Sequence, residues 1–222
     1  MTFSVVIPSG NSANLVSCVR SLLAAEPELS AGEIIVVDDG ARAGAEASLP
    51  DVHWITGITP FIFSRNSNLG ITMAGRDVIL MNDDANLITP RGFSLLVEET
   101  LRHPDVGLCS AGIRGVVGNP RQIVTARPGF RYEPRAIAFV CLFVPWRTYV
   151  TLGPLDERFV GYGFEDNDYC ARVLEAEMKI GIYDACVVDH AKHPSVYRNR
   201  PNFAVLFEQN RQLYRSKWGR DS

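Results

Sequence analysis

Apolar residues in the first part of the chain follow two alternating patterns. Residues 3–7 and 33–37 are short β-branched apolar runs, typical of strands covered on both faces. Between these runs, Leu15, Val19 and Leu22 recur at the spacing of one helical face, and the segment ends before Pro27. The chain is therefore predicted to open with a strand, a helix and a second strand.

The same alternation continues to residue 110. Short apolar runs predict strands at 52–55, 77–81 and 106–110, separated by predicted helices at 66–75 and between Pro90 and Pro104. Strands separated by helices pair mostly in parallel, with helices on both faces of the sheet. We therefore predict one α/β domain with a mostly parallel central sheet flanked by helices.

The pattern is looser after residue 112. The segment from Arg114 to Arg135 is rich in glycine, proline and arginine, which predicts a surface excursion or a β-hairpin. The apolar run 136–144 predicts a central strand. Residues 165–178 predict a helix, 179–188 short strands, and 203–218 a final amphipathic helix.

Composition narrows the functional classes. The chain has 222 residues and a net charge of −3, so no overall positive field favours a nucleic-acid backbone or an anionic membrane. No apolar run reaches the length of a membrane span, and the first residues lack the features of a secretory signal, so we predict a cytoplasmic protein. The odd number of cysteines, without a CxxC pair, predicts buried thiols (Cys18, Cys109, Cys141, Cys170 and Cys186).

Acidic pairs follow two of the predicted buried strands. Asp38 and Asp39 come after the run 33–37, and Asp83 and Asp84 come shortly after the run 77–81. Ligands of open parallel sheets bind outside the carboxyl ends of the strands, so both pairs are expected to face one crevice, although strand capping alone also accounts for each pair. Crowded carboxylates favour a hard divalent cation. We predict Mg²⁺ or Mn²⁺, with water and a diphosphate as the other ligands.

A third acidic cluster and a histidine complete the candidate chemistry. Glu165, Asp166 and Asp168 follow a glycine-rich turn and open a predicted helix, where carboxylates serve as caps or as a general base. His190 ends a predicted strand, and neutral imidazole is a ligand for Mn²⁺. His190 is therefore a candidate metal ligand if its strand ends near Asp84.

Six short segments, in chain order, resemble the signature of the family 2 glycosyltransferases with the GT-A fold. They are VVIPS at 5–9, IVVDDG at 35–40, RNSNLG at 65–70, LMNDDA at 80–85, GFEDNDYCAR at 163–172 and VVDH at 187–190. The resemblance implies a single GT-A domain over residues 1–222, with a donor-nucleotide half at 1–110 and an acceptor half with the C-terminal helix at 111–222. It also implies inverting, metal-dependent transfer of a sugar from a nucleoside diphosphate sugar.

The resemblance also implies roles for individual residues. Asp84, in the position of the Asp-x-Asp motif, is implied as the metal ligand together with His190. Asp166 is implied as the catalytic base, with Glu165 as a second catalytic candidate and Asp168 as the fallback base. The residues implied to contact the donor are Pro8, Ser9, Asp39, Arg65, Asn66, Gly70, Asn82 and Asp83.

The sequence departs from the family pattern at two positions. Asn82 stands where an aspartate is usual, and Ala41 stands where a serine is common. The first departure favours Asp84 over Asp83 as the direct metal ligand. The second leaves recognition of the donor base open.

Two other functions remain open on the sequence alone. A nucleotidyltransferase shares this kind of sheet and metal, but the chain lacks a glycine-rich loop with a basic residue after its first strand. A catalytically inactive nucleotide-sugar-binding module is the other alternative. The Gln-x-x-Arg-Trp motif is missing, which predicts non-processive transfer of one sugar per encounter.

The substrates are only partly defined. UDP-sugars are mildly favoured by the family, with GDP- and TDP-sugars still open, and the acceptor is a glycan, a lipid-linked sugar, a protein, a small metabolite or a modified nucleobase. The short acceptor half makes a partner, or a second copy of the chain in a homodimer, a candidate for completing the acceptor site. The final helix carries basic residues that either form a solvated face or contact an anionic acceptor (Arg211, Arg215, Lys217 and Arg220).

Overall fold

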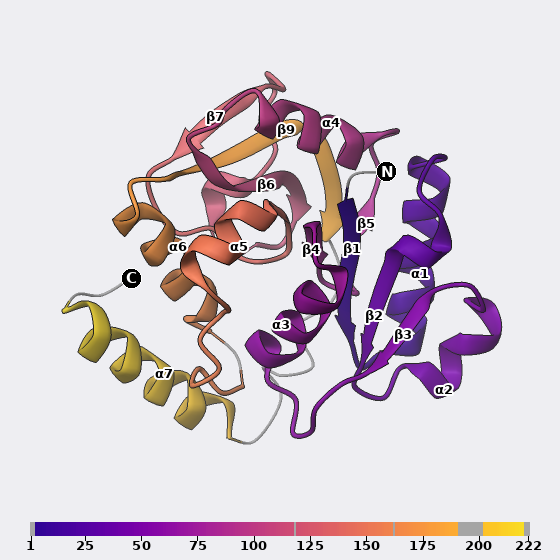
Figure 1. Ribbon diagram of the computed structural model, residues 1–222, viewed down its shortest axis with the longest axis horizontal. Helices are drawn as coiled ribbons and strands as arrows, with labels where there is room; N and C mark the ends of the chain where they lie inside the picture. The colour runs from indigo at the N-terminus through magenta and orange to yellow at the C-terminus, as the bar shows by residue number, and fades with distance from the viewer. Residues whose placement is uncertain (1–2, 118, 162, 191–201, 220–222) are drawn as a thin grey trace.

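A computed structural model describes residues 3–117, 119–161, 163–190 and 202–219. It is a single mixed α/β fold in which helices surround a curled sheet (Figure 1). The strands of the described residues are β1 (Phe3–Ser9), β2 (Ile34–Asp38), β3 (His53–Thr56), β4 (Asp77–Met81), β5 (Asn86–Leu87), β6 (Val106–Gly115), β7 (Phe130–Glu133), β8 (Cys141–Val144) and β9 (Lys179–His190).

Seven α-helices connect or flank these strands in the described residues. They are α1 (Ser12–Ala25), α2 (Arg42–Ala45), α3 (Phe63–Ala74), α4 (Gly92–Leu101), α5 (Trp146–Leu152), α6 (Glu165–Glu175) and α7 (Phe203–Trp218). Three 3₁₀ turns add Ala31–Glu33, Glu46–Ser48 and Pro120–Gln122. In the described part of the chain, no helix has both the length and the apolarity needed to cross a bilayer.

The sheet is parallel in its first half and mixed in its second. The strand order is β3-β2-β1-β4-β8-β6-β9-β5, and β7 pairs with β9 outside this path. Strands β3, β2, β1 and β4 are parallel neighbours, as the alternation of strands and helices predicts. Strand β8 runs antiparallel to both β4 and β6, and β6 and β9 are parallel again.

Two apolar cores cover the two faces of the sheet. Along β1, Val5 and Ile7 belong to the core shared with α1 and α4, whereas Val6 belongs to the core shared with α3, α5 and α6. This division follows from the alternation of side chains along a strand. The continuous apolar runs of the sequence are therefore strands that are buried on both faces, as predicted.

The second half of the chain differs from its prediction in detail. The excursion after β6 is not a hairpin closed on itself, because its strand β7 pairs with β9, which lies much later in the sequence. The apolar run 136–144 forms a central strand only from Cys141, and the preceding residues approach the sheet without joining it. The short strands expected at 179–188 are one long strand, whose pairing with β6 has register shifts between Val106 and Leu108 and between Ala111 and Gly112.

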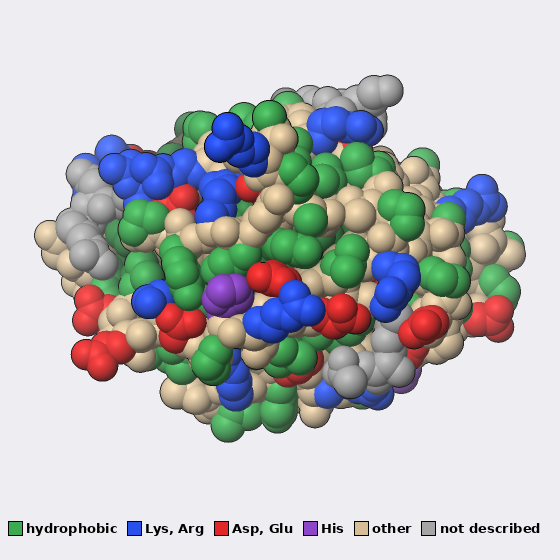
Figure 2. All heavy atoms as spheres, turned by 90° about the horizontal axis from the view of Figure 1, so that it is seen from above, with side chains coloured by type: hydrophobic (Ala, Val, Ile, Leu, Met, Phe, Trp, Pro, Cys, Tyr) green, Lys and Arg blue, Asp and Glu red, His purple; other side chains and the backbone are tan. Residues whose placement is uncertain are grey.

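Surface charge agrees with the near-neutral composition. On the face seen in Figure 2, acidic and basic side chains are interspersed, with apolar side chains between them. All five cysteines are free and buried, as predicted. The final helix α7 lies beside α6 at one side of the molecule, away from α1 and α2 (Figure 1).

Candidate functional site

The two acidic pairs lie at one edge of the sheet, on either side of the end of β1. Ser9, the last residue of β1, connects them: its carbonyl accepts a hydrogen bond of 2.7 Å from the Asp39 N–H, and its Oγ donates one of 2.6 Å to Asp83 Oδ2. The order β2-β1-β4 explains this placement, because parallel strands end at the same edge.

Within the first pair, Asp38 has a local structural role. Its Oδ1 accepts hydrogen bonds of 2.9 Å from the N–H groups of Gly40 and Arg42, so this carboxylate orders the turn that leads into α2. Asp39 is the member of the pair that the turn presents beside Ser9 and the loop residue Gly10.

In the second pair, Asp83 points inward. Burial raises the pKa of Asp83 to about 6, and the neighbouring charge of Asp84 adds to the rise, although hydrogen bonds from Ser9, Asn11 and Asn14 oppose it. These hydrogen bonds hold Asp83 against the turn between β1 and α1. The local structure therefore separates the roles of two adjacent aspartates, one inward and one directed to a histidine.

Asp84 meets His190 across the sheet edge. Strand β5 begins directly after the acidic segment and pairs antiparallel with the end of β9, with Asn86 opposite Asp189. This pairing places His190 Nε2 3.1 Å from Asp84 Oδ1, and both side chains are about one-seventh exposed (14% and 15%). Burial lowers the pKa of His190, but Asp84, the Val116 carbonyl and Asp189 together raise it above its ordinary value.

The donor set at this pair fits a hard divalent cation. The Nδ1 of His190 contacts the carbonyl oxygen of Val116, which only accepts, so Nδ1 carries a hydrogen. In neutral imidazole, Nε2 then presents a lone pair to a carboxylate oxygen, and a positive species must lie between these two acceptors, either a proton or a metal ion. In the described residues, no group of three or more His, Cys, Asp or Glu side chains is arranged around a metal position. Two protein ligands are sufficient for Mg²⁺ or Mn²⁺ when water and phosphate supply the rest.

The third acidic cluster reaches the same edge through the segment before β8. Asp166, in the first turn of α6, accepts hydrogen bonds from the Asn167 N–H at 2.8 Å and from the backbone N–H of Phe139. The next residue, Val140, accepts a 2.9 Å hydrogen bond from the Asn82 N–H. A continuous chain of contacts therefore runs from Asp39 through Ser9, the β4 end and this segment to Asp166.

Glu165 and Asp166 share a desolvated position. Burial raises the pKa of both carboxyls, and the charge of Asp166 adds to the rise at Glu165. Backbone N–H groups at the start of α6 stabilise the ionised forms and limit the rise. A carboxylate with a raised pKa in such a site is suited to accept a proton.

Asp168 is the fallback base of the prediction, and the structure gives it another role. Its side chain is fully buried and is held by Lys217 Nζ at 2.7 Å, by Trp218 Nε1 at 2.9 Å and by Arg172 Nε at 3.2 Å. These partners come from α6 and α7, and they enclose the carboxylate. Asp168 is therefore an anchor between two helices and is not exposed to a substrate.

The predicted donor-loop residues occupy different positions. Asn66 is buried, and its Oδ1 accepts a 3.0 Å hydrogen bond from the Ile58 N–H, which ties α3 to the loop after β3. Arg65 turns back onto that loop and donates to the carbonyls of Ile58 and Pro60. Its side chain also lines a hollow of about 500 Å³ beside α3 and α5, together with Thr72, Tyr149 and Glu157. The acidic residues at the strand ends and at the start of α6 do not line this hollow.

Pro8 and Gly70 lie inside the fold. Pro8 is buried within β1, opposite Val37 of β2. Gly70 lets α3 approach the sheet, because a Cβ there would lie 2.3 Å from Val6 Cγ1 and 3.0 Å from Val37 Cγ2. Gly70 is thus a packing position between helix and sheet and not part of the exposed edge.

Several groups that contact these acidic residues and His190 were not predicted from the sequence. Asn11, the N-cap of α1, and Asn14, in the first turn of α1, act on Asp83, and only Asn11 gave a signal in the sequence, as part of a capping turn. The backbone groups of Phe139 and Val116 carry no signal, because any residue supplies them. Asn210 of α7 lies in a polar stretch of the sequence, so its residue type gives no sign that its side chain is buried.

Comparison with known sequences and structures identifies a family with this fold. The sequence model of the glycosyl transferase family 2 matches residues 4–145. The structure is similar to a crystal structure of GalNAc-T7 with UDP, GalNAc and Mn²⁺, with a TM-score of 0.72 and 13% identity over 97% of this chain and 50% of that chain. It is also similar to S. aureus TarS 1-349, with a TM-score of 0.61 and 14% identity over 86% of this chain and 60% of that chain.

A curated relative adds sequence similarity without a known function. The uncharacterized protein y4gI of Sinorhizobium fredii (strain NBRC 101917 / NGR234) is 24% identical over 205 residues, which cover 78% of this chain and 22% of that protein. The chain thus matches about a fifth of that relative and half or somewhat more of the two similar structures. The family match extends over more than half of the chain, from β1 to the end of β8, and the fold agrees with it: the chain belongs to the glycosyl transferase family 2 and has the GT-A fold.

Proposed function

We propose that the chain transfers one sugar from a nucleoside diphosphate sugar to an acceptor hydroxyl, with inversion at the anomeric carbon. The observation that carries the proposal is the contact chain that joins Asp39, Asp83 and Asp166 at one sheet edge, with the Asp84–His190 pair beside it. The GalNAc-T7 neighbour, crystallised with UDP, GalNAc and Mn²⁺, supports a nucleotide-sugar donor. A UDP-sugar is therefore the first donor to test.

The parallel half of the sheet binds the donor in this proposal. Asp39, presented by the β2 turn next to Ser9, contacts the nucleoside, and Asn82 and Asp84 border the diphosphate. Asp84 and His190 hold Mn²⁺ or Mg²⁺, which when bound neutralises charge on the leaving diphosphate. Arg65 and Asn66 order the loop after β3, which forms one wall of the donor site, and Pro8 and Gly70 support it from inside.

Asp166 supplies the proton acceptor. Its carboxylate takes the proton of the acceptor hydroxyl while that oxygen bonds to the anomeric carbon, and the bond from that carbon to the diphosphate breaks on the opposite face. The proton ends on Asp166, and the electron pair of the broken bond leaves with the nucleoside diphosphate. The neighbouring Glu165 has a raised pKa and therefore stays protonated to a higher pH. The Glu165–Asp166 pair then carries one negative charge and not two.

The remaining parts of the activity follow from the same site. We propose that the chain transfers one sugar at a time, as the missing Gln-x-x-Arg-Trp motif predicts, and a cytoplasmic location stays a prediction from the sequence. A homodimer remains a prediction. The main alternative is a module that binds a nucleotide sugar without turnover, because binding needs the β1, β2 and β4 edge but not Asp166.

Turnover separates these alternatives. We would measure binding of UDP by calorimetry and release of UDP from UDP-glucose and UDP-N-acetylglucosamine, each with Mn²⁺. For the wild-type chain we expect both binding and release. Asp166→Asn should keep UDP binding and lose on the order of 10²-fold or more of the release rate. Binding without release in the wild type, or undiminished release by Asp166→Asn, would contradict the proposal.

A further inference from the structure

Helix α7 makes hydrogen bonds to the loop that leads into the first turn of α6, which carries Asp166. Asn210 of α7 is 3% exposed, and its Oδ1 accepts a 3.1 Å hydrogen bond from the Val160 N–H. Its Nδ2 donates to the carbonyls of Val160 and Gly163, both at 3.0 Å. One side chain therefore satisfies both peptide groups of Val160 and a carbonyl that lies three residues before Asp166.

This loop needs external support, because its backbone is in the left-handed region at several positions. The φ angles are 82° at Gly161, 101° at Gly163 and 73° at Phe164, and Phe164 is a non-glycine residue for which this region costs free energy. Side chains of α7 cover the loop: a Cβ on Gly163 would lie 2.8 Å from Phe207 Cε2. The Phe164 ring packs against Phe207 and Tyr214, with centroids 5.2 Å and 5.6 Å apart.

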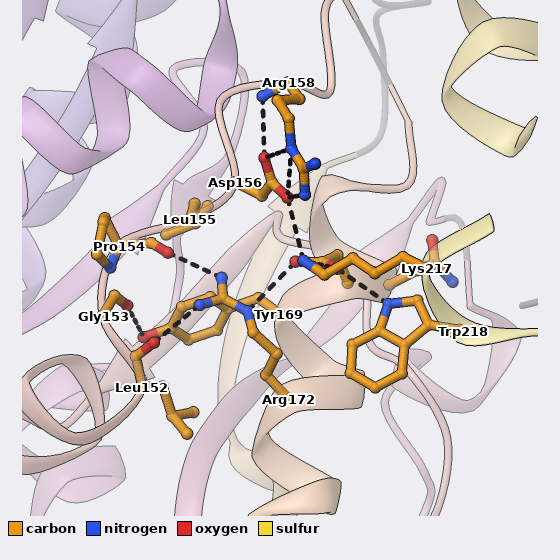
Figure 3. A network of polar contacts seen from close by, with 12 residues as sticks. Leu152, Gly153, Pro154, Leu155, Asp156, Arg158, Tyr169, Arg172, Lys217 and Trp218 are labelled. Carbon is orange, nitrogen blue, oxygen red and sulfur yellow. Dashed lines mark hydrogen bonds and ion pairs between the residues drawn. The ribbon is translucent and has the colours of Figure 1, made fainter. Parts of the chain in front are cut away.

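Helix α7 also holds the chain just after Asp166. Lys217 Nζ lies 2.7 Å from Asp168 Oδ1 and 3.0 Å from Asp156 Oδ2, and Trp218 Nε1 donates to Asp168 Oδ1 at 2.9 Å. Figure 3 shows the Lys217 side chain extending from α7 toward Asp156 and Arg158, with the Trp218 indole beside it. Because Asp168 is fully buried, loss of these partners would leave its charge poorly compensated.

We propose that α7 positions the Asp166 carboxylate, and that Asn210 and Trp218 are the positioning residues. The proposal rests on the proposed role of Asp166 as general base. Phe164 lies two residues before Asp166, and Asp168 lies two residues after it, so α7 restrains the backbone on both sides of the base. A misplacement of about 1 Å at a reacting group costs on the order of 10²-fold in rate. Among the basic residues expected on the final helix, Lys217 thus serves an internal contact, Arg211 pairs with Glu208 of the same helix, and Arg220 lies outside the described residues.

Hydrogen exchange tests the structural half of this proposal without a substrate. On the full chain, Asn210→Ala should exchange faster in peptides that contain Val160 or Asp166, and at the wild-type rate in peptides from β1 and β4. Glu26→Gln is the matched control: Glu26 is buried and caps α4 through the N–H groups of Phe93 and Ser94, far from α7 in the fold. It should loosen α4 and leave the Val160 and Asp166 peptides unchanged.

Steady-state kinetics test the functional half. With UDP-glucose or UDP-N-acetylglucosamine and Mn²⁺, Asn210→Ala and Trp218→Phe should each lower kcat for UDP release at least tenfold. The KM for the donor and the calorimetric Kd for UDP should stay within about twofold. Asn210 and Trp218 contact the loop before α6 and the Asp168 carboxylate, and not the strand ends proposed to bind the nucleotide. Trp218→Phe keeps an aromatic ring at this position and removes the part of the indole that carries the N–H bound to Asp168, so unfolding becomes a weaker explanation for a loss of rate. A general loss of stability, as in Glu26→Gln, would not produce this split between kcat and KM.

The outcomes separate the two proposals. Wild-type exchange rates at Val160 and Asp166 in Asn210→Ala overturn the positioning role, whether or not any donor turns over. Unchanged kcat in Asn210→Ala and Trp218→Phe, while Asp166→Asn is inactive, also overturns it and leaves the general base intact. Undiminished UDP release by Asp166→Asn overturns the proposed function itself. Faster exchange together with the kcat loss supports both.

Discussion

His190 Nε2 faces Asp84 Oδ1 at 3.1 Å across 106 residues of sequence. The contact exists because β5 and β9 pair antiparallel next to both residues, and because the Val116 carbonyl orients the imidazole ring. The pair is thus held in place before any ligand binds. Such preorganisation lowers the cost of gathering ligands around a cation.

The first prediction concerns metal affinity. With UDP present, Asp84→Asn and His190→Ala should each weaken Mn²⁺ binding by about tenfold or more, because each removes one of the two proposed protein ligands. Electron paramagnetic resonance of free Mn²⁺ measures this directly. Asp51→Asn, an exposed aspartate away from the edge, is the matched control and should bind Mn²⁺ as the wild type does. Equal affinity of all variants would place the metal elsewhere.

The second prediction concerns the dependence of the rate on pH. Burial raises the pKa of Asp166, and this carboxyl must be ionised to accept a proton. The rate of UDP release should therefore fall on the acid side, with a midpoint above the ordinary aspartate value of about 3.9. A profile of kcat against pH, recorded at saturating Mn²⁺, checks it. A rate that is constant down to the ordinary aspartate value would argue against this base.

The third prediction concerns stability against pH at Glu165. Burial raises the pKa of this carboxyl in the folded chain, so between its ordinary and its raised value the unfolded chain is ionised while the folded chain is still protonated. The contribution of Glu165 to stability is therefore full at low pH and is lost as pH rises through the folded pKa. Relative to Glu165→Gln, the wild-type Tm should fall more steeply between about pH 5 and pH 9. Parallel Tm curves for the two proteins would be inconsistent with a desolvated carboxyl.

The fourth prediction concerns the contact between α3 and the sheet. Alanine is normally preferred over glycine in a helix by about 1 kcal/mol, but a Cβ at Gly70 would lie 2.3 Å from Val6 Cγ1. Gly70→Ala should therefore lower the free energy of unfolding by roughly 1–3 kcal/mol, measured by urea denaturation. Gly129→Ala is the control, because nothing lies within 4 Å of its Cβ position, and it should be nearly neutral. A stabilised Gly70→Ala would show that α3 can shift away from the sheet.

Local sequence patterns located the acidic groups, whereas only the family resemblance assigned them different roles. Asp38 and Asp39 look alike in the sequence, yet only Asp38 caps the α2 turn. Asp166 and Asp168 both open a helix, yet Asp168 is enclosed by Lys217 and Trp218. The roles of Asp166 and Asp168 differ because residues of α7, a distant segment, hold the Asp168 carboxylate. A local sequence pattern does not encode contacts of that kind.

The strands and helices from β1 to β6, apart from α2 and β5, and the strand-end position of the first two acidic pairs were determined by the sequence alone, because periodicity, turn residues and the geometry of parallel strands are local properties. Tertiary structure decided the antiparallel placement of β8, the pairing of β7 with β9 and the meeting of Asp84 with His190. It also decided that α7 closes over the loop before Asp166. These features depend on contacts between segments far apart in the chain, where the free energy comes from packing and paired polar groups and not from the propensity of any one segment.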